Sequence, residues 1–276
     1  MASVDRYRVV GNPIAHSKSP EIHALFAEQT GHAISYDKHF VELDRFAEEA
    51  AAFFSSGGKG MNITVPFKDD AFAYADAVTK RAELAGAVNT LAVQLDGSIL
   101  GDNTDGQGLV WDITERLGWS LKAKKVLVLG AGGAVKGVLY SLLEQKPAEL
   151  IVANRTASKA VNVVSQFEKF GSIRAIGFDQ VTDTDKFDII INATSASLSG
   201  QLPLISESIF TSSCRVYDMV YADALTPFLR WAKSCGAQSV SDGLGMLIGQ
   251  AAESFTLWTK KRPDIQASYE HFKSQL

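Results

Sequence analysis

The heptapeptide N-I-T-V-P-F-K, Asn62 to Lys68, puts a lysine where a helix is predicted to begin. Pro66 suits the first position of a helix, so Lys68 is predicted in the first helical turn, where the peptide dipoles carry partial positive charge. An ammonium group is disfavoured there, whereas Asp69 and Asp70, which follow, are favoured. We therefore expect Lys68 to serve something other than helix stability.

A second candidate for chemistry is Asp105, which lies in the turn-forming stretch G-D-N-T-D-G. An Asx turn is one explanation for an aspartate in such a setting. The alternative is an acid/base pair with Lys68, in which each group favours the charged state of the other. The two residues alone leave both explanations open.

Ser17 and Ser19 stand just before P-E-I-H-A-L-F, which reads as a helix start with Pro20 at its first position. Ser19 is then the predicted N-cap. The functional alternative is a pair of hydroxyls aimed at a polar ligand from the loop after the first strand. The residues favour neither explanation over the other.

No metal site is expected. The five histidines, His16, His23, His32, His39 and His271, show no metal-ligand spacing and are predicted to be structural or surface residues. Cys214 and Cys235 are too far apart for a zinc knuckle or a redox pair, and each is predicted to be a lone buried thiol. Two such cysteines fit a reducing cytoplasm.

The composition is that of a soluble globular protein with a sizeable core. The chain has 276 residues, of which 46% are hydrophobic and 21% charged, and its length favours two domains. A net charge of -4 offers no general attraction for nucleic acid or an anionic membrane, so a small-molecule partner is expected. The amino terminus lacks an apolar signal region, and no apolar run is long enough to enter a membrane.

Short apolar runs alternate with helical patterns, which predicts the α/β class with mostly parallel sheets. The expected strands are YRVVG, ISYDKHF, GMNITV, NTLAVQ, KVLVLG, LIVANR, FDIIINAT and RVYDMV. Asp96-Gly97 is predicted to turn one hairpin, which would add a small antiparallel piece to the first sheet.

A domain boundary is expected near residues 102–107, where turn formers precede a helical stretch at 109–117. The second unit then begins with a strand at Lys124. After Ser241 apolar residues recur at spacings of three and four, from Leu244 to Trp258, which predicts a helix. The residues alone do not say which unit this tail packs on.

The stretch K-V-L-V-L-G-A-G-G-A predicts a dinucleotide site, because a buried strand runs into Gly130, Gly132 and Gly133 and then into a helix at 135–143. Such glycines let the backbone turn tightly and approach a pyrophosphate at the helix amino terminus. Val135 departs from the pattern, which expects a small residue there. An ordinary tight turn is the alternative.

The end of the next strand favours NADP over NAD. A free ribose 2′-hydroxyl is normally held by an acidic residue about twenty positions on, whereas this strand ends in Asn154, Arg155 and Thr156. Arg155, with Lys159 one turn later, would pair with a 2′-phosphate instead. The alternative is a solvated Arg155 and a Thr156 that only caps a helix.

Several motifs in order over nearly the whole chain together resemble the shikimate dehydrogenases. They are G-N-P-I-A-H-S-K-S-P, N-I-T-V-P-F-K, G-A-V-N-T, G-D-N-T-D-G, G-A-G-G-A, N-R-T, N-A-T-S and D-G-L-G-M-L-I-G-Q-A-A. The resemblance implies a substrate domain at 1–102, completed by carboxy-terminal helices at 243–276. It also implies a Rossmann-like NADP domain at 103–242.

The resemblance further implies roles for individual residues. Lys68 and Asp105 would be the catalytic pair. Contacts to the hydroxyls and carboxylate of shikimate would come from Ser17, Ser19, Thr64, Asn89, Tyr221 and Gln250. NADP would be held by Gly130, Ala131, Gly132, Gly133, Ala134, Asn154, Arg155, Thr156 and Lys159, with Thr194, Met219 and Gly243 on the nicotinamide side. Lys159 replaces a frequent arginine, which would weaken NADP binding, and Ala24 replaces a common asparagine without expected catalytic effect.

The implied reaction is the reversible NADPH-dependent reduction of 3-dehydroshikimate to shikimate, a step towards chorismate and the aromatic amino acids. Lys68 would move the proton or support the developing alkoxide electrostatically. The alternatives are a paralogue that also accepts quinate and a non-catalytic NADP-binding sensor. The family implies a cytoplasmic monomer or homodimer.

Overall fold

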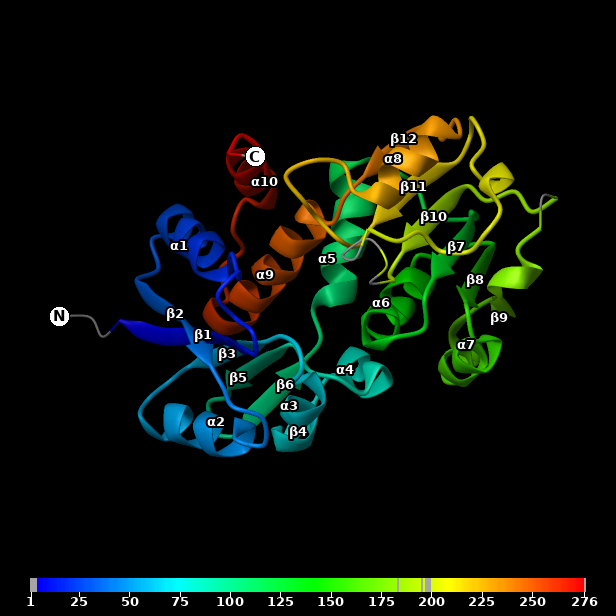
Figure 1. Cartoon of the computed structure of the whole chain (residues 1–276). Helices are drawn as coiled ribbons and strands as arrows, with labels where there is room; N and C mark the ends of the chain where they lie inside the picture. Colours follow the sequence, from blue (N-terminus) through cyan, green and yellow to red (C-terminus); the bar gives the residue numbers. More distant parts are fainter. Residues whose placement is uncertain (1–3, 183, 195, 197–199, 276) are drawn as a thin grey trace. The chain divides into compact units, whose positions relative to one another are not determined.

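The computed structural model describes residues 4–182, 184–194, 196 and 200–275. By their internal contacts these residues divide into two compact units, which are coloured along the sequence in Figure 1. Unit 1 contains Met1–Gly108 and Ile248–Gln275, and unit 2 contains Leu109–Leu247. The predicted α/β class is confirmed in both units.

Unit 1 is built on a mixed sheet of order β2-β1-β3-β5-β6-β4. The strands are β1 (Asp5–Gly11), β2 (Ile34–Phe40), β3 (Gly60–Ile63), β4 (Ala77–Val78), β5 (Thr90–Val93) and β6 (Ile99–Asp102). β1 pairs in parallel with β2 and β3, whereas β5 runs antiparallel to both β3 and β6. The predicted hairpin between β5 and β6 is confirmed, and Gly97 at its turn has a φ of 87°.

Helices cover both faces of this sheet (Figure 1). The helices are α1 (Ser19–Thr30), α2 (Phe46–Ser55), α3 (Lys68–Tyr74), α4 (Lys80–Ala85), α9 (Leu244–Thr259) and α10 (Ile265–Lys273). Phe53 of α2 and Phe67, at the start of α3, are buried against one face. On the other face Tyr7 stacks on Trp258 of α9 with ring centroids 4.6 Å apart. The tail helix α9 therefore completes the core of unit 1.

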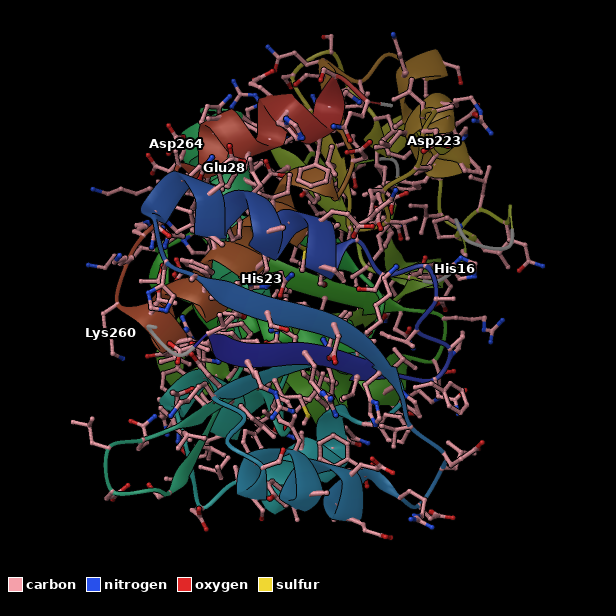
Figure 2. All side chains as sticks on the ribbon, turned by 90° about the vertical axis from the view of Figure 1, so that its left-hand side faces the viewer. His16, His23, Glu28, Asp223, Lys260 and Asp264 are labelled. Carbon is pink, nitrogen blue, oxygen red and sulfur yellow. The ribbon has the colours of Figure 1, made fainter. Side chains whose placement is uncertain are left out.

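His23 of α1 belongs to this second face and lies between α1 and the strands in Figure 2. It is fully buried, and its ring stacks on Tyr36 of β2 with centroids 4.3 Å apart. Burial lowers the pKa of His23 to about 3. The prediction of a structural histidine fits a ring held neutral among aromatic neighbours.

Unit 2 is built on a parallel sheet of order β12-β11-β10-β7-β8-β9, the doubly wound Rossmann order. The strands are β7 (Lys125–Leu129), β8 (Glu149–Asn154), β9 (Ile173–Gly177), β10 (Ile189–Asn192), β11 (Arg215–Asp218) and β12 (Ser239–Ser241), and the helices are α6 (Gly133–Glu144), α7 (Ala157–Val164) and α8 (Pro227–Ser234). The central strands have continuous apolar runs, with polar residues only at their ends, because both faces of such a sheet are buried. The order reverses between β7 and β10, where ligands bind in this fold.

Three local predictions are wrong. Lys18 occupies the N-cap of α1 without a side-chain cap bond, and Ser19 is already helical, with its N–H donated to Ser17 Oγ at 3.3 Å. Pro66 lies in the turn before α3, whose N-cap is Phe67, although Lys68 is in the first turn as predicted. The helix expected to start near residue 109 begins at Asp105, as α5 (Asp105–Trp111), since a carboxylate stabilises a helix amino terminus.

Candidate functional site

Lys68 and Asp105 form an ion pair in unit 1, with 2.5 Å between Lys68 Nζ and Asp105 Oδ2. Their side chains are 29% and 14% exposed, so the pair is shielded but still open to a small molecule. Lys68 begins α3 and Asp105 begins α5. The Asx turn here is made by Asn103, whose Oδ1 accepts the Asp105 N–H at 3.2 Å, and this leaves the Asp105 carboxylate to Lys68.

Asn89 holds the second oxygen of Asp105. Its Nδ2 donates to Asp105 Oδ1 at 2.8 Å and to Thr104 Oγ1 at 3.0 Å, while its Oδ1 accepts the Thr104 N–H at 3.0 Å. The neighbouring Val88 N–H donates to the Lys68 carbonyl at 2.9 Å. One short segment thus fixes both members of the Lys68–Asp105 pair.

The chain before Asp105 is anchored by Asp102 at the end of β6, whose side chain is 2% exposed. Arg81 donates to both carboxylate oxygens, at 2.7 and 2.5 Å, and Thr79 Oγ1 donates at 2.5 Å. Burial acts to raise the pKa of Asp102, but Arg81 and Thr79 hold it below its usual value. The ionised carboxylate also accepts the Asn103 N–H at 2.8 Å, which fixes the loop that delivers Asp105.

The remaining predicted substrate residues are distributed over both units. Ser17 Oγ donates to Ser19 Oγ at 3.1 Å, and Thr64 follows β3, partly buried. Gln250 on α9 accepts a long hydrogen bond, 3.5 Å, from Thr104 to its Oε1, which connects it to the Asn89 cluster. Tyr221 belongs to unit 2.

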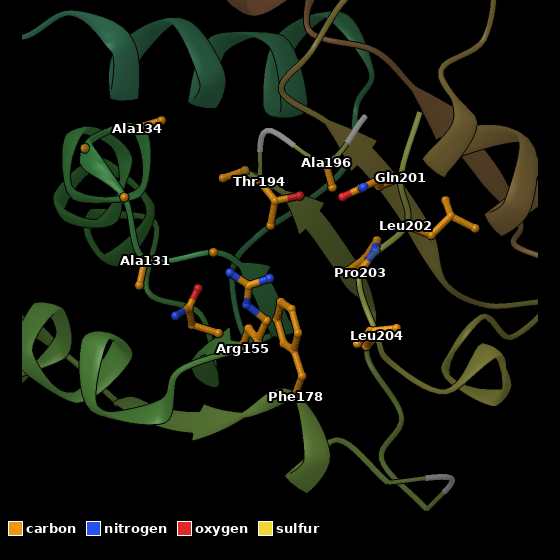
Figure 3. Close-up of a pocket in the computed structure, with 15 residues that line it drawn as sticks. Ala131, Ala134, Arg155, Phe178, Thr194, Ala196, Gln201, Leu202, Pro203 and Leu204 are labelled. Carbon is orange, nitrogen blue, oxygen red and sulfur yellow. The ribbon is translucent and has the colours of Figure 1, made fainter. Parts of the chain in front are cut away.

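Unit 2 contains a cavity of about 830 Å³ at the end of β7 (Figure 3). It is lined by Gly130, Ala131, Gly132, Gly133, Ala134, Asn154, Arg155, Phe178, Ala193, Thr194, Ala196, Gln201, Leu202, Pro203 and Leu204. Gly130 has a φ of +115°, which other residues rarely adopt, and a side chain at Gly132 or Gly133 would enter open space. Val135, the departure from the glycine pattern, is fully buried.

Four predicted cofactor residues do not line this cavity. Thr156 sits at the N-cap of α7 without a side-chain cap bond, and Lys159 is exposed on the same helix. Met219 and Gly243 touch through their backbones, since a side-chain carbon added at Gly243 would lie 2.2 Å from the Met219 carbonyl oxygen. The absence of a side chain at Gly243 is required for that close approach.

Sequence reasoning missed two groups of residues. Phe178, at the start of a short 3-10 helix, and Gln201–Leu204, in a loop, line the cavity, and no periodic pattern marks them. Buried polar residues surround Asn89, namely Asn62, Thr90, Thr104 and Ser254. Of these, Ser254 could have been found from the sequence, because a polar residue on the apolar stripe of α9, beside Phe255, stands out.

The described residues contain neither a metal-binding cluster nor a helix that could span a membrane. Among them, no group of three or more His, Cys, Asp or Glu side chains is arranged to hold a metal ion. No helix in the same part of the chain has the length and apolar character needed to cross a membrane.

Three family models match the chain. Residues 9–91 match the shikimate dehydrogenase substrate binding domain, residues 112–219 match shikimate / quinate 5-dehydrogenase, and residues 243–270 match the shikimate 5′-dehydrogenase C-terminal domain. The three matches together cover most of the chain.

Individual relatives match over almost their whole length. The chain is 52% identical over 272 residues to the shikimate dehydrogenase (NADP(+)) of Cellvibrio japonicus, covering 99% of this chain and 98% of the relative. Among solved structures, an Ael1 enzyme from Pseudomonas putida is 43% identical with a TM-score of 0.91, covering 97% of each chain. Shikimate 5-dehydrogenase from Thermus thermophilus, in complex with NADP(H) and shikimate, is 32% identical with a TM-score of 0.86, covering 99% of this chain and all of that one.

Proposed function

This chain belongs to the shikimate dehydrogenase family, and we propose that it catalyses the reversible NADPH-dependent reduction of 3-dehydroshikimate to shikimate, a step in aromatic amino acid biosynthesis. It is an NADP-dependent oxidoreductase. The observation that carries the proposal is the Lys68–Asp105 pair, 2.5 Å apart and braced by Asn89. A sensor without catalysis would have no use for a shielded lysine and aspartate at two helix starts.

The cavity of unit 2 fits NADP. Gly130 to Ala134 present backbone at the start of α6, where N–H groups and the helix dipole favour a pyrophosphate. Arg155 lines the same cavity, and Asn154 and Thr156 beside it carry no charge that would repel a 2′-phosphate. Thr194 lines it too, while Thr156, Lys159, Met219 and Gly243 are proposed to contact more distant parts of the cofactor. When bound, NADPH supplies the hydride.

Lys68 and Asp105 manage the proton. The Lys68 ammonium donates a hydrogen bond to the substrate oxygen and passes it a proton as negative charge develops there; in the oxidative direction the neutral amine takes that proton back. Asp105 holds Nζ in place and stabilises its charge. Asn89, in turn, fixes the carboxylate through the 2.8 Å bond to Oδ1.

The same proposal assigns substrate recognition and domain roles. The hydroxyls and carboxylate of the substrate are bound by Ser17, Ser19, Thr64, Asn89, Tyr221 and Gln250. Residues 1–102 and 243–276 form the substrate domain, and residues 103–242 form the NADP domain. Support comes from the linked positions of Asn89 and Gln250 around the Lys68–Asp105 pair.

We further propose a cytoplasmic protein that works as a monomer or homodimer. Cys214 is buried as predicted, Cys235 is only partly buried, contrary to the prediction, and neither forms a disulfide, which fits a reducing compartment. Sedimentation of the purified protein would report its oligomeric state, and a stable trimer or larger assembly would contradict the proposal.

An absorbance assay at the NADPH band tests the function. Purified protein is mixed with shikimate and NADP, with quinate and NADP, or with shikimate and NAD. We expect kcat/KM to be at least about tenfold higher for the first mixture than for either other one. Equal efficiency with quinate would favour the broader paralogue, and no reduction of NADP in any mixture would refute the proposal.

A further inference from the structure

Ser254 on α9 is a fully buried hydroxyl at the centre of a polar cluster in unit 1. Its Oγ lies 3.0 Å from Asn62 Nδ2, 2.7 Å from Thr90 Oγ1 and 3.3 Å from Thr104 Oγ1. These partners come from β3, from β5 and from the loop before α5. A helix more than 160 residues away in sequence from Thr90 thus supplies one hydroxyl to β5, the strand that begins directly after Asn89.

In the first hydrogen bonds of this cluster the donor and the acceptor are fixed. Burial raises the pKa of Tyr36 well above its usual value, so its hydroxyl keeps its proton and donates to Asn62 Oδ1 at 2.7 Å. With its oxygen used in this way, Asn62 turns its Nδ2 donors towards Ser254 Oγ and Thr90 Oγ1, at 3.0 and 3.2 Å. Ser254 therefore accepts from Asn62, and its own proton is left to donate.

The donors in the next hydrogen bonds follow from the single proton that each hydroxyl can donate. Thr90 Oγ1 donates its single proton to Asn89 Oδ1 at 2.8 Å. At the 2.7 Å contact between Thr90 and Ser254 the serine must then be the donor. The Gln250 carbonyl is a second acceptor for that proton, at the longer distance of 3.1 Å. The hydrogen bonds thus run in one direction, from Tyr36 through Asn62, Ser254 and Thr90 to Asn89.

The last hydrogen bonds of this series determine the orientation of the Asn89 side-chain amide. Its Oδ1 accepts from Thr90 and from the Thr104 N–H, so its Nδ2 must face the Asp105 carboxylate. If the amide were reversed, an oxygen would face Asp105 Oδ1, an NH2 group would face the Thr104 N–H, and the Thr90 hydroxyl would have to turn its proton away from Asn89. The two buried hydroxyls oppose that reversal.

We propose that Ser254 and Thr90 are positioning residues for catalysis, which act on Asp105 and hence on Lys68 by fixing the orientation of the Asn89 amide. This inference rests on the proposed dehydrogenase function and deepens it. Both side chains are fully buried. Their effect reaches the Lys68–Asp105 pair only through Asn89.

Single substitutions test the two hydroxyls. Ser254→Ala and Thr90→Val remove a hydroxyl each, and we expect kcat to fall about tenfold while the KM for shikimate changes less than about threefold. Thr90→Ser keeps the hydroxyl and should recover most of the rate lost in Thr90→Val. The matched control is Ser268→Ala, because Ser268 is also a fully buried helical serine of unit 1 that donates to a carbonyl four residues back. Its kcat should stay within about twofold of wild type.

A mutant cycle separates positioning from general destabilisation. If Ser254 acts through Asn89, adding Ser254→Ala to Asn89→Ala should lower kcat no further, whereas an effect on folding alone would add to it. The Thr90→Val and Thr90→Ser pair, repeated in the Asn89→Ala background, gives the same test should Ser254→Ala fail to fold. The inference is overturned if the single variants keep wild-type kcat or if their effects are additive with Asn89→Ala. An inactive wild-type protein would instead refute the proposed function itself.

Discussion

Lys68 and Asp105 pair across 2.5 Å, and each is the first residue of its own helix. The dipole of α5 favours the carboxylate at that position, whereas the dipole of α3 disfavours the ammonium. Asp105 therefore gains from both its helix and its partner, whereas Lys68 gains from its partner and not from its helix. Lys68, as the cationic member of the pair, is the one that carries a proton to donate.

Replacing Lys68 should impair chemistry more than binding. We expect Lys68→Ala to lower kcat by at least about 100-fold, because a positioned acid or base contributes about that much, with a small change in the KM for shikimate. Steady-state kinetics at saturating NADP measure both constants. Lys80→Ala is the control, since Lys80 is an exposed lysine at the start of a neighbouring helix. A Lys68→Ala enzyme with near-normal kcat would exclude Lys68 from the proton transfer.

Replacing Arg155 should change cofactor selectivity. Loss of a guanidinium–phosphate pair is expected to lower kcat/KM with NADPH by about 30-fold and to leave the efficiency with NADH within about threefold. Titration with adenosine 2′,5′-bisphosphate gives a binding readout that does not depend on turnover. Arg174→Ala is the matched control, because Arg174 is a half-exposed arginine on the neighbouring strand β9, paired with Glu149. Equal losses with both cofactors would show that Arg155 does not recognise the 2′-phosphate.

Removing Arg81 should destabilise the protein by leaving Asp102 buried and unpaired. We expect Arg81→Ala to lower the free energy of unfolding by about 3 kcal/mol, measured by urea denaturation. The adjacent Lys80→Ala breaks only an exposed pair with Glu83 and should cost less than about 1 kcal/mol. Similar losses for the two variants would mean that the Asp102 site contributes no special stability.

His23 should make the protein less stable in mild acid. Its pKa in the folded protein is about 3, below the usual 6.5, so below pH ~6.5 the unfolded chain binds a proton that the folded protein does not. The free energy of unfolding should fall by about 1.4 kcal/mol more in wild type than in His23→Phe between about pH 7.5 and about pH 5.5. Urea denaturation at the two pH values measures this difference.

His271→Gln, which alters an exposed histidine, should keep the wild-type dependence on pH. The expectation for His23 fails if wild type and His23→Phe lose the same stability over this interval.

Most helices and strands were predictable because strong local signals mark them, whereas the residues alone left the roles of Lys68 and Asp105 open and only the family resemblance implied that they act as a pair. Apolar runs predicted the longer strands, and Asp96-Gly97 predicted the hairpin. The strands β4, β9 and β12 were missed; β4 and β12 have only two and three residues, and β9, Ile173–Gly177, contains an arginine and ends in a glycine. The N-cap predicted for α1 was wrong because the helix begins one residue earlier than expected, which makes Lys18 the N-cap.

The surroundings of the pair were not predictable, because they depend on long-range contacts. Nothing in the local sequence of Ser254, on helix α9, relates it to Thr90 in strand β5, and only the fold brings the two hydroxyls to 2.7 Å. Ser254 lies three residues after Ala251 on the apolar stripe of α9, and its buried hydroxyl requires a partner. The identity of that partner is a property of the tertiary structure.

Unit 1 is discontinuous in the sequence, with residues 248–275 joining residues 1–108. The ribosome therefore releases the first sheet long before it synthesises Trp258 and Phe255, which cover Tyr7 and Phe26. During that interval the nascent chain carries an uncovered aromatic surface, while unit 2 is synthesised as a single run of residues that ends before residue 248. We therefore expect that unit 2 can fold during translation, whereas unit 1 must wait for the last helices, so that the first sheet is the last part of this protein to become native.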